Sequence, residues 1–398
     1  QSGLRPDLRL LLMSATLDGP ALAAELDAAY LHAPGRGHPV DLRHRAMSLE
    51  QALGGGLKKL LTDITRQPGG SVLVFLPGEG EIHRASKSLQ GLGTPVLPLY
   101  ARLDATAQQR ALYSDERRII LATAVAESSL TLSGIDTVVD CGWARFPEFD
   151  PAAGYGRLVT RRVSQAQADQ RSGRAGRTQP GTAWRLWSDE ELLPAALAPD
   201  IQRVDLSGLV LELARWGSPD VPWLEAPHRG RWQQASALLM DLGLLGESGA
   251  LTALGQAVAR RPLEPRWALL LQWAAEAADP EREELLRLLS LVAGTLKLPR
   301  EPVDMAEMLL QWREQRLSPA LLGALKQELR RLNQQCRPVS RPHLPRPAAG
   351  EDLLAFACAS VFPDRIAQPR GARGRYRLSG GGGATLNPEH ALNESAFL

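Results

Sequence analysis

The sequence contains 398 residues, of which 44% are hydrophobic and 23% are charged, and its formal net charge is +2. This balance excludes disordered, collagen-like and membrane-embedded chains, and the length allows two or three domains with hydrophobic cores. The three cysteines and seven histidines are dispersed without metal-ligand spacing. We therefore expect no metal site in this chain, no disulfide framework and a reducing, cytoplasmic compartment.

The chain begins with an apolar run, Leu8–Met13, that is typical of a buried parallel strand, followed by Ser14 and Thr16. A helix is predicted over Ala21–Ala29. The first residue is not Met, and the opening residues read as the interior of a fold, so we expect a fragment. Residues 33–50 are rich in Pro, Gly and His and predict a crossover between domains.

Residues 49–140 alternate between helical patterns and short apolar runs. Strands are predicted at Ser71–Leu76, Thr94–Leu99, Arg117–Ala122 and Asp136–Asp140, and helices at Leu49–Arg66, Glu79–Gly91 and Ala105–Leu112. Such alternation predicts a parallel sheet that binds ligands at the carboxyl ends of its strands. The polar residues just past one strand end are Thr123, Glu127, Ser128, Ser129 and Thr131. They are also compatible with an ordinary surface loop.

Two extended segments around Asp150–Gly156 predict a β-hairpin, whose second strand carries Arg157, Arg161 and Arg162. The stretch Gln165–Arg177, QAQADQRSGRAGR, follows it.

In that stretch Arg171, Arg174 and Arg177 are spaced three apart, so on a helix they can share one face. Each of the two glycines between them costs a helix about 1 kcal/mol relative to alanine. Glycines retained despite this cost indicate that a large anion approaches the backbone closely. Guanidinium is the preferred planar donor for phosphate, which is such an anion. The alternative is an arginine-rich, solvated helix face.

The C-terminal half is mostly helical. Helices at Leu206–Trp216 and Arg231–Leu242, a Gly-marked turn and an amphipathic segment suggest a winged-helix module, although the second helix is too weakly basic to read a DNA groove. Residues 262–335 carry apolar stripes typical of a helical bundle. After a linker and a helix at Asp352–Phe362, a strand-like segment resembles the opening of an OB-type barrel, with Arg365, Arg370, Arg373, Arg375 and Arg377. The chain ends before such a barrel closes, so we expect truncation there too.

The motifs together resemble a known family. The order of SAT at 14–16, VLVFLPGEGEI at 72–82, ATAVAESSLTLSGIDTVVDCG at 122–142 and QADQRSGRAGR at 167–177 resembles motifs III to VI of superfamily 2 helicases. Their spelling and the hairpin are similar to the DEAH/RHA group. The segments at 205–217 and 362–386 are similar to the bacterial HrpB-type ATP-dependent helicases. The resemblance covers essentially the whole chain, and motifs V and VI in order are specific.

The resemblance implies an α/β fold in which two RecA-like domains clamp ATP. It predicts a RecA-like parallel-sheet domain, then an all-α winged-helix/ratchet region and the start of an OB-like β-barrel. The implied domains are a remnant of the first RecA-like domain (1–32), the second RecA-like domain (33–195), a winged helix (196–261), a ratchet-like bundle (262–350) and an OB-like start (351–398).

The resemblance also implies roles for single residues. Gln170, Arg174 and Arg177 would face the nucleotide, with Arg174 and Arg177 as arginine fingers that stabilise the transition state. The role of Arg171 is less clear. The remaining implied residues are Ser14 and Thr16, which would couple hydrolysis to domain closure, Thr131 near the nucleotide, and Thr123 on the nucleic-acid backbone.

The sequence also departs from the family pattern. Ala124 stands where related sequences often carry Asn, and Ser133 where many carry Asp, so a carboxylate contact to magnesium-bound water or ribose is lost at that position. No G-x-x-x-x-G-K-[ST] loop occurs, the nearest segment being LGGGLKK at 53–59, and no DEAH-like box precedes Ser14. ATP with Mg²⁺ is therefore expected to bind mainly through a first RecA-like domain that this chain largely lacks.

Two classes of function follow. The first is an ATP-driven helicase that moves along single-stranded RNA or DNA, with this chain alone inactive. The second is a nonenzymatic nucleic-acid-binding or regulatory fragment. We favour the first, because the arginine fingers would otherwise meet no phosphate. Nucleic-acid contacts are predicted at Thr123, Arg161, Arg162, Arg373 and Arg375, in a monomer without membrane contact.

Overall fold

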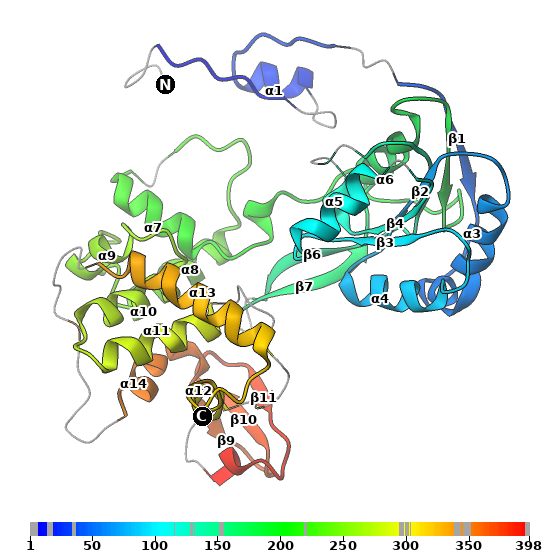
Figure 1. Cartoon of the computed structure of the whole chain (residues 1–398). Coiled ribbons are helices and arrows are strands. Elements are labelled where there is room, and N and C mark those ends of the chain that lie inside the picture. The colour runs from blue at the N-terminus through cyan, green and yellow to red at the C-terminus, as the bar shows by residue number, and fades with distance from the viewer. Residues whose placement is uncertain are drawn as a thin grey trace. The chain divides into compact units, whose positions relative to one another are not determined.

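The computed structural model describes residues 7–13, 19–33, 37–114, 116–127, 130, 132–150, 155–218, 221–293, 298, 302, 304–337, 344 and 352–394. The chain divides into two compact units, residues 1–147 with 158–199 and residues 148–157 with 200–398. Each unit has hydrophobic clusters of its own. Figure 1 labels most of the helices and strands of both units.

The first unit is built on a six-stranded sheet in the order β1-β8-β5-β2-β4-β3. All of its strand pairs are parallel, as the alternating pattern predicts. The strands are β1 (Val40–His44), β2 (Ser71–Phe75), β3 (Val96–Leu99), β4 (Ile119–Ala122), β5 (Ile135–Asp140) and β8 (Gly181–Arg185). The central strands β2 and β4 are buried along their whole length, because helices cover both faces of the sheet.

Alternate residues of β2 face two different hydrophobic clusters. Val72 and Val74 belong to the cluster that includes residues of α3 and α4, whereas Leu73 and Phe75 belong to the cluster that includes residues of α5. The first-unit helices are α1 (Gly19–Glu25), α2 (Leu49–Gln51), α3 (Leu57–Thr65), α4 (Glu79–Ser88), α5 (Ala105–Tyr113) and α6 (Gln165–Ser172). The sheet is thus a packed middle layer, and its carboxyl edge is available to carry a site.

Two local predictions are wrong, and a third is confirmed with an irregularity. Residues 8–13 belong to no strand, and Met13 is 82% exposed, because an apolar run is buried only where neighbouring strands pair with it. The predicted crossover at 33–50 contains β1, a half-exposed edge strand that pairs Val40 with Gly181. The helix predicted at 49–66 is interrupted by a π-helical segment, Ala52–Gly56.

The predicted hairpin is present as a two-stranded sheet of β6 (Trp143–Asp150) and β7 (Tyr155–Arg162). Arg145 of β6 pairs with the buried Glu81 of α4, with 3.0 Å between Nη2 and Oε2. A Cβ atom at Gly78 would lie 2.7 Å from the Arg145 guanidinium, so a side chain at position 78 would displace the guanidinium from its present place. The ion pair fastens the base of the hairpin to the sheet-bearing unit.

The second unit is mainly helical around one large cluster of leucines and tryptophans. Its helices are α7 (Ser207–Trp216), α8 (Arg229–Asp241), α9 (Ala253–Val258), α10 (Pro265–Glu276), α11 (Glu281–Val292), α12 (Met305–Arg313), α13 (Pro319–Gln335) and α14 (Leu353–Val361). None of the helices in the described part of the chain is both long and apolar enough to cross a membrane.

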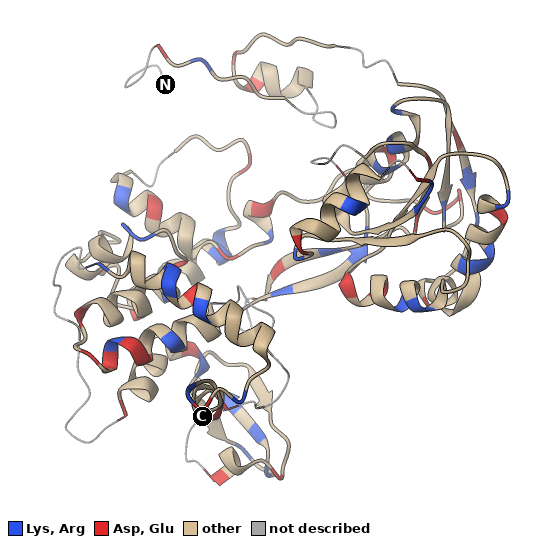
Figure 2. Ribbon diagram, viewed as in Figure 1, with Lys and Arg blue, Asp and Glu red and all other residues tan. Residues whose placement is uncertain are grey.

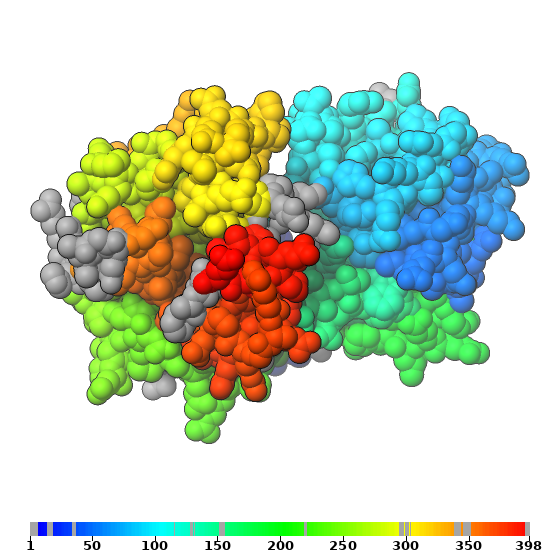
Figure 3. All heavy atoms as spheres, turned by 90° about the horizontal axis from the view of Figure 1, so that it is seen from below, coloured from blue at the N-terminus to red at the C-terminus, as the bar shows by residue number. Residues whose placement is uncertain are grey.

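Three short strands form an antiparallel sheet near the C-terminus, β9 (Ala367–Pro369), β10 (Arg375–Leu378) and β11 (Gly383–Thr385). This segment, orange to red, lies at the surface of the second unit in Figure 3. A bidentate ion pair between Arg266 of α10 and Asp364, with both distances 2.8 Å, joins the turn that precedes β9 to the helices. The domain boundaries inside this unit stay predictions.

Candidate functional site

The arginine-rich stretch begins with a capped helix. In α6 the Ser164 hydroxyl accepts from the Gln167 backbone, and the Gln167 side chain accepts from the Ser164 backbone. This capping box fixes where the helix starts. The α-helix ends at Ser172, and a 3₁₀ turn, Gly173–Gly176, carries the chain across the sheet. The three arginines therefore do not lie on one continuous helix.

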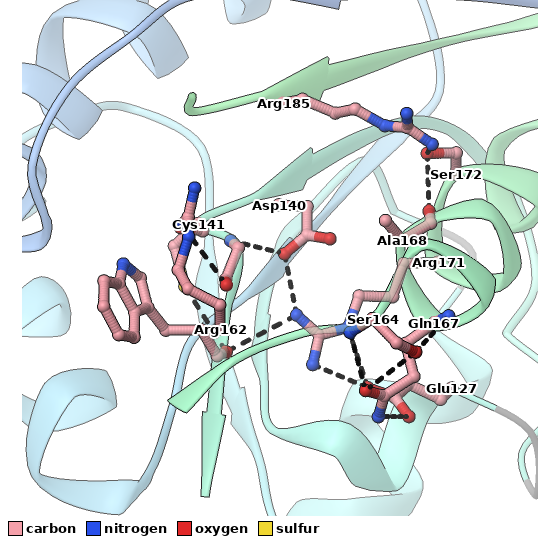
Figure 4. A network of polar contacts seen from close by, with 12 residues as sticks. Glu127, Asp140, Cys141, Arg162, Ser164, Gln167, Ala168, Arg171, Ser172 and Arg185 are labelled. Carbon is pink, nitrogen blue, oxygen red and sulfur yellow. Dashed lines mark hydrogen bonds and ion pairs between the residues drawn. The ribbon is translucent and has the colours of Figure 1, made fainter. Parts of the chain in front are cut away.

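Arg171 is completely buried at the carboxyl edge of the sheet (Figure 4). Its Nε donates to Glu127 Oε1 at 2.7 Å, and its Nη1 donates to Asp140 Oδ1 at 2.7 Å. The guanidinium also lies 4.8 Å from the centre of the Phe75 ring. Burial disfavours the charged form, but the carboxylates of Asp140 and Glu127 outweigh it and raise the pKa of Arg171.

Arg174 is also buried, with 2% of its surface exposed, but its partners are different. Its Nε donates to the backbone oxygen of Glu127 at 3.0 Å, and its Nη1 donates to that of Leu130 at 2.5 Å. Its Nη2 is buried without a hydrogen-bond partner among the described residues. Burial, and then the charge of Arg177, lower the pKa of Arg174 to about 10. The hydrogen bonds that Arg174 donates to these carbonyl oxygens hold the cation in place without neutralising its charge.

The expectation that all three arginines share one face is wrong. Arg171 points into the sheet edge, Arg174 contacts the segment after β4, and Arg177 is exposed. The reason is the change from α-helix to 3₁₀ turn after Ser172, which alters the direction of successive side chains.

The two glycines of the stretch have different reasons to be glycine. A Cβ atom at Gly176 would lie 2.5 Å from the His38 oxygen and 2.7 Å from Val40 Cγ2. Gly176 therefore admits the chain that leads into β1, not an anion, which corrects the sequence prediction for this position. A Cβ atom at Gly173 would meet no described atom within 4 Å, so only that backbone remains open to a ligand.

The other predicted nucleotide and coupling residues are placed as follows. Gln170 is half-buried on α6, one residue before Arg171. Thr123 is half-buried at the end of β4, where it begins the 3₁₀ turn Ala124–Ala126. The remaining residues, Ser14, Thr16 and Thr131, lie outside the described residues.

The residues predicted to contact nucleic acid differ in their exposure. The Arg162 guanidinium lies 5.0 Å from the Trp143 ring centre and 5.3 Å from that of Trp187, and its Nε donates to Glu191 at 2.6 Å. Arg161, Arg373 and Arg375 are exposed, and Arg373 lies 3.7 Å from a Glu394 oxygen. Lys and Arg are interspersed with Asp and Glu over both units in Figure 2.

Sequence reasoning missed the role of two carboxylates. Glu127 is identifiable only as one of several polar residues after a strand, and Asp140 only as the last residue of a buried strand. An acidic residue that ends an apolar strand, in a chain with an arginine motif, is the signal that could have found Asp140. Among the described residues, no group of His, Cys, Asp and Glu could hold a metal ion.

Comparisons with known proteins agree with the motif order. The model of the helicase conserved C-terminal domain matches residues 56–179. The chain is 38% identical to the ATP-dependent RNA helicase HrpB of Escherichia coli K12, covering 100% of this chain and 48% of HrpB. It is 34% identical to the pre-mRNA-splicing factor ATP-dependent RNA helicase prp22 of Schizosaccharomyces pombe, covering 76% of this chain and 28% of that protein.

The solved structures give the same result. The fold is similar to two crystal structures of E. coli HrpB, described as a DExH-box NTPase and as a DEAH/RHA helicase. The TM-scores are 0.78 and 0.81, with 37% and 36% sequence identity, over 100% of this chain and 48% and 50% of those chains. The chain thus spans about half the length of these HrpB relatives.

Proposed function

The chain belongs to the DEAH/RHA family of ATP-dependent RNA helicases, and we propose that its sheet-bearing unit supplies the arginine side of an ATP site that drives movement along single-stranded RNA. This unit has the RecA-like fold of a helicase C-terminal domain. The named activity of its relatives supports ATP as the nucleotide and RNA as the track.

The environment of Arg174 carries the proposal. A buried donor without a partner costs about 1–3 kcal/mol, and a buried charge costs more unless an opposite charge accompanies it. Among the described residues, Arg174 Nη2 has no hydrogen-bond partner and Arg174 donates to no carboxylate. Arg177 is also close enough to lower the pKa of Arg174. A phosphate group placed beside Arg174 and Arg177 would supply the negative charge that both cations lack.

The same arrangement suits phosphoryl transfer. Negative charge develops on the phosphoryl oxygens in the transition state, and a guanidinium already desolvated and oriented stabilises it without reorganisation. Arg174 and Arg177 would fill this role, and Gln170 of α6 would also face the nucleotide. Magnesium would accompany ATP and neutralise its phosphates, but we assign no ligand to it among the described residues.

The remaining roles are extensions of the same proposal. Thr123, at the carboxyl end of β4, would contact the RNA backbone, where parallel sheets bind their ligands. Thr131 would lie near the nucleotide, and Ser14 with Thr16 would couple hydrolysis to domain closure. The assignments of Ser14, Thr16 and Thr131 rest on the motif match alone.

The test is RNA-stimulated ATP hydrolysis by the full-length protein. Arg174→Ala and Arg177→Ala should each lower kcat sharply, because an arginine finger is typically worth about 10³–10⁵ in kcat. Affinity for a labelled single-stranded RNA should change little. Arg66→Ala serves as the control, since Arg66 is exposed and ends the helix that leads to the amino end of β2. Wild-type turnover in either finger variant would exclude that residue from the role.

A further inference from the structure

Glu127 makes contacts with both buried arginines through separate atoms. Its carboxylate accepts from Arg171, and Gln167 Nε2 approaches it at 3.4 Å. Its backbone oxygen accepts from Arg174 Nε at 3.0 Å. Its backbone nitrogen donates to Ala124 at 2.9 Å, which closes the 3₁₀ turn after β4. Figure 4 shows the carboxylate directed toward the Arg171 guanidinium.

We propose that Glu127 is a positioning residue, whose ion pair with Arg171 fixes the backbone oxygen that holds Arg174 in place. The inference rests on the proposed function, because Glu127 itself is assigned no contact with the nucleotide or RNA. Glu127 acts through Arg174.

Arg171 is a suitable anchor because it is itself fixed. Asp140 Oδ1 accepts from Arg171 and also from the Gly142 backbone at 2.8 Å, which ties the guanidinium to the end of β5. Phe75, at the end of β2, lies under the guanidinium. The Glu127 side chain is thereby tied to two strand ends. A charged pair removed from solvent is held more tightly than one in water, because the local dielectric is low.

Because the Glu127 side chain is fixed, the backbone oxygen of the same residue is held in place as well. Arg174 has two carbonyl partners, and one of them belongs to Glu127. When the carboxylate is lost, the turn keeps its hydrogen bond to Ala124 but loses its attachment to Arg171. The Arg174 guanidinium then shifts with the turn. A displacement of about 1 Å of a group that stabilises the transition state can cost about 10²-fold in rate.

The experiment is a double-mutant cycle on the full-length protein, with single-turnover hydrolysis of radiolabelled ATP in the presence of saturating single-stranded RNA. Glu127→Ala should lower the rate about 10²-fold, with a smaller change in the ATP concentration at half-maximal rate. In an Arg174→Ala background, Glu127→Ala should cause no further fall, because the group it positions is gone. An equal factor in both backgrounds would show that Glu127 acts independently of Arg174 and would overturn the inference.

Two further variants separate positioning from general stability. Glu127→Asp keeps the charge but shortens the side chain by one methylene, so it should fold and still lose rate in the same non-additive way. Arg185→Met is the matched control. Arg185 lies on β8, next to β5, is 6% exposed, and pairs with Asp169 of α6 at 2.5 Å. This variant should lower the unfolding midpoint while leaving the rate close to wild type. A wild-type rate in Glu127→Asp, together with a rate loss in Arg185→Met as large as that in Glu127→Ala, would refute the positioning role. Wild-type turnover in Arg174→Ala would instead remove the proposed function itself.

Discussion

Arg171 and Arg174 both donate to Glu127, but Arg171 reaches its carboxylate at 2.7 Å whereas Arg174 reaches its backbone oxygen at 3.0 Å. Although they are three residues apart in one motif, the two guanidiniums thus have different electrostatic surroundings. Arg171 is neutralised by two acids, and Arg174 is not. The first is suited to hold the fold together and the second to meet an anion.

Their contributions to stability should therefore differ. Arg171→Met leaves two buried carboxylates without their cation and should lower the free energy of unfolding of this chain by about 3–5 kcal/mol. Arg174→Met removes a cation that has no carboxylate partner, so its loss should be smaller. Urea unfolding measures both, with Arg43→Met as an exposed control whose pair with Asp41 should contribute under about 1 kcal/mol. Equal losses at 171 and 174 would contradict the assignment.

The isolated chain should hydrolyse ATP negligibly. Its 398 residues contain no G-x-x-x-x-G-K-[ST] loop to cradle the phosphates, so the arginines act on a nucleotide that this chain does not itself bind tightly. A steady-state phosphate-release assay on the purified 398-residue chain checks this. Robust turnover that disappears in Arg177→Ala would show that the chain carries a complete site.

Alkaline pH should destabilise the chain through Cys141. Burial, and then the Asp140 carboxylate, raise the pKa of this thiol to about 12. An unfolded thiol titrates near pH 8.5, so the stability conferred by the neutral folded thiol is fully present below that pH and falls by up to about 1.4 kcal/mol per pH unit as the pH rises toward 12. Unfolding curves for wild type and Cys141→Ala are recorded from about pH 8 to about pH 10.5, a range that spans the start of this fall. The two free energies of unfolding should converge as the pH rises. A constant gap would contradict the shifted thiol.

Single-stranded RNA should bind weakly to this chain, without sequence preference and with steep salt dependence. Each phosphate contact contributes a slope of roughly −0.7 in the logarithm of affinity against that of salt. Fluorescence anisotropy across a salt series should show this slope fall in Arg373→Glu with Arg375→Glu, while Arg66→Glu leaves it unchanged. Affinity that is flat against salt would exclude backbone contacts.

The hairpin contribution is tested separately through Arg161. Changing Arg162 as well would confuse binding with folding, because its guanidinium lies between Trp143 and Trp187 and pairs with Glu191. If Arg161→Glu abolishes RNA binding and the variant Arg373→Glu with Arg375→Glu does not, the RNA strand follows the sheet-bearing unit.

The fold was predictable where burial is uniform. β2 and β4 are recognisable because every residue of these two central strands is apolar or small. β1 was missed because an edge strand is half exposed, and Leu8–Met13 was wrongly predicted because burial depends on partners that local sequence does not reveal.

The candidate site was predictable only in part. The motif order identifies the arginines, but their environments depend on residues distant in sequence. Glu127 lies 44 positions before Arg171, and Asp140 lies 31 positions before it. No spacing rule relates these residues, since the sheet brings them together. The difference between Arg171 and Arg174 therefore emerged only with the three-dimensional structure.

The tight fit at Gly176 has an evolutionary consequence. Because β1 enters the sheet against this glycine, any side chain there would push away the His38 oxygen, whatever the protein binds. Selection for a foldable sheet alone is enough to keep position 176 unchanged among descendants, so its invariance would carry no information about catalysis. Position 173 has no such steric reason, and a glycine retained there over long divergence would be a record of selection by a ligand.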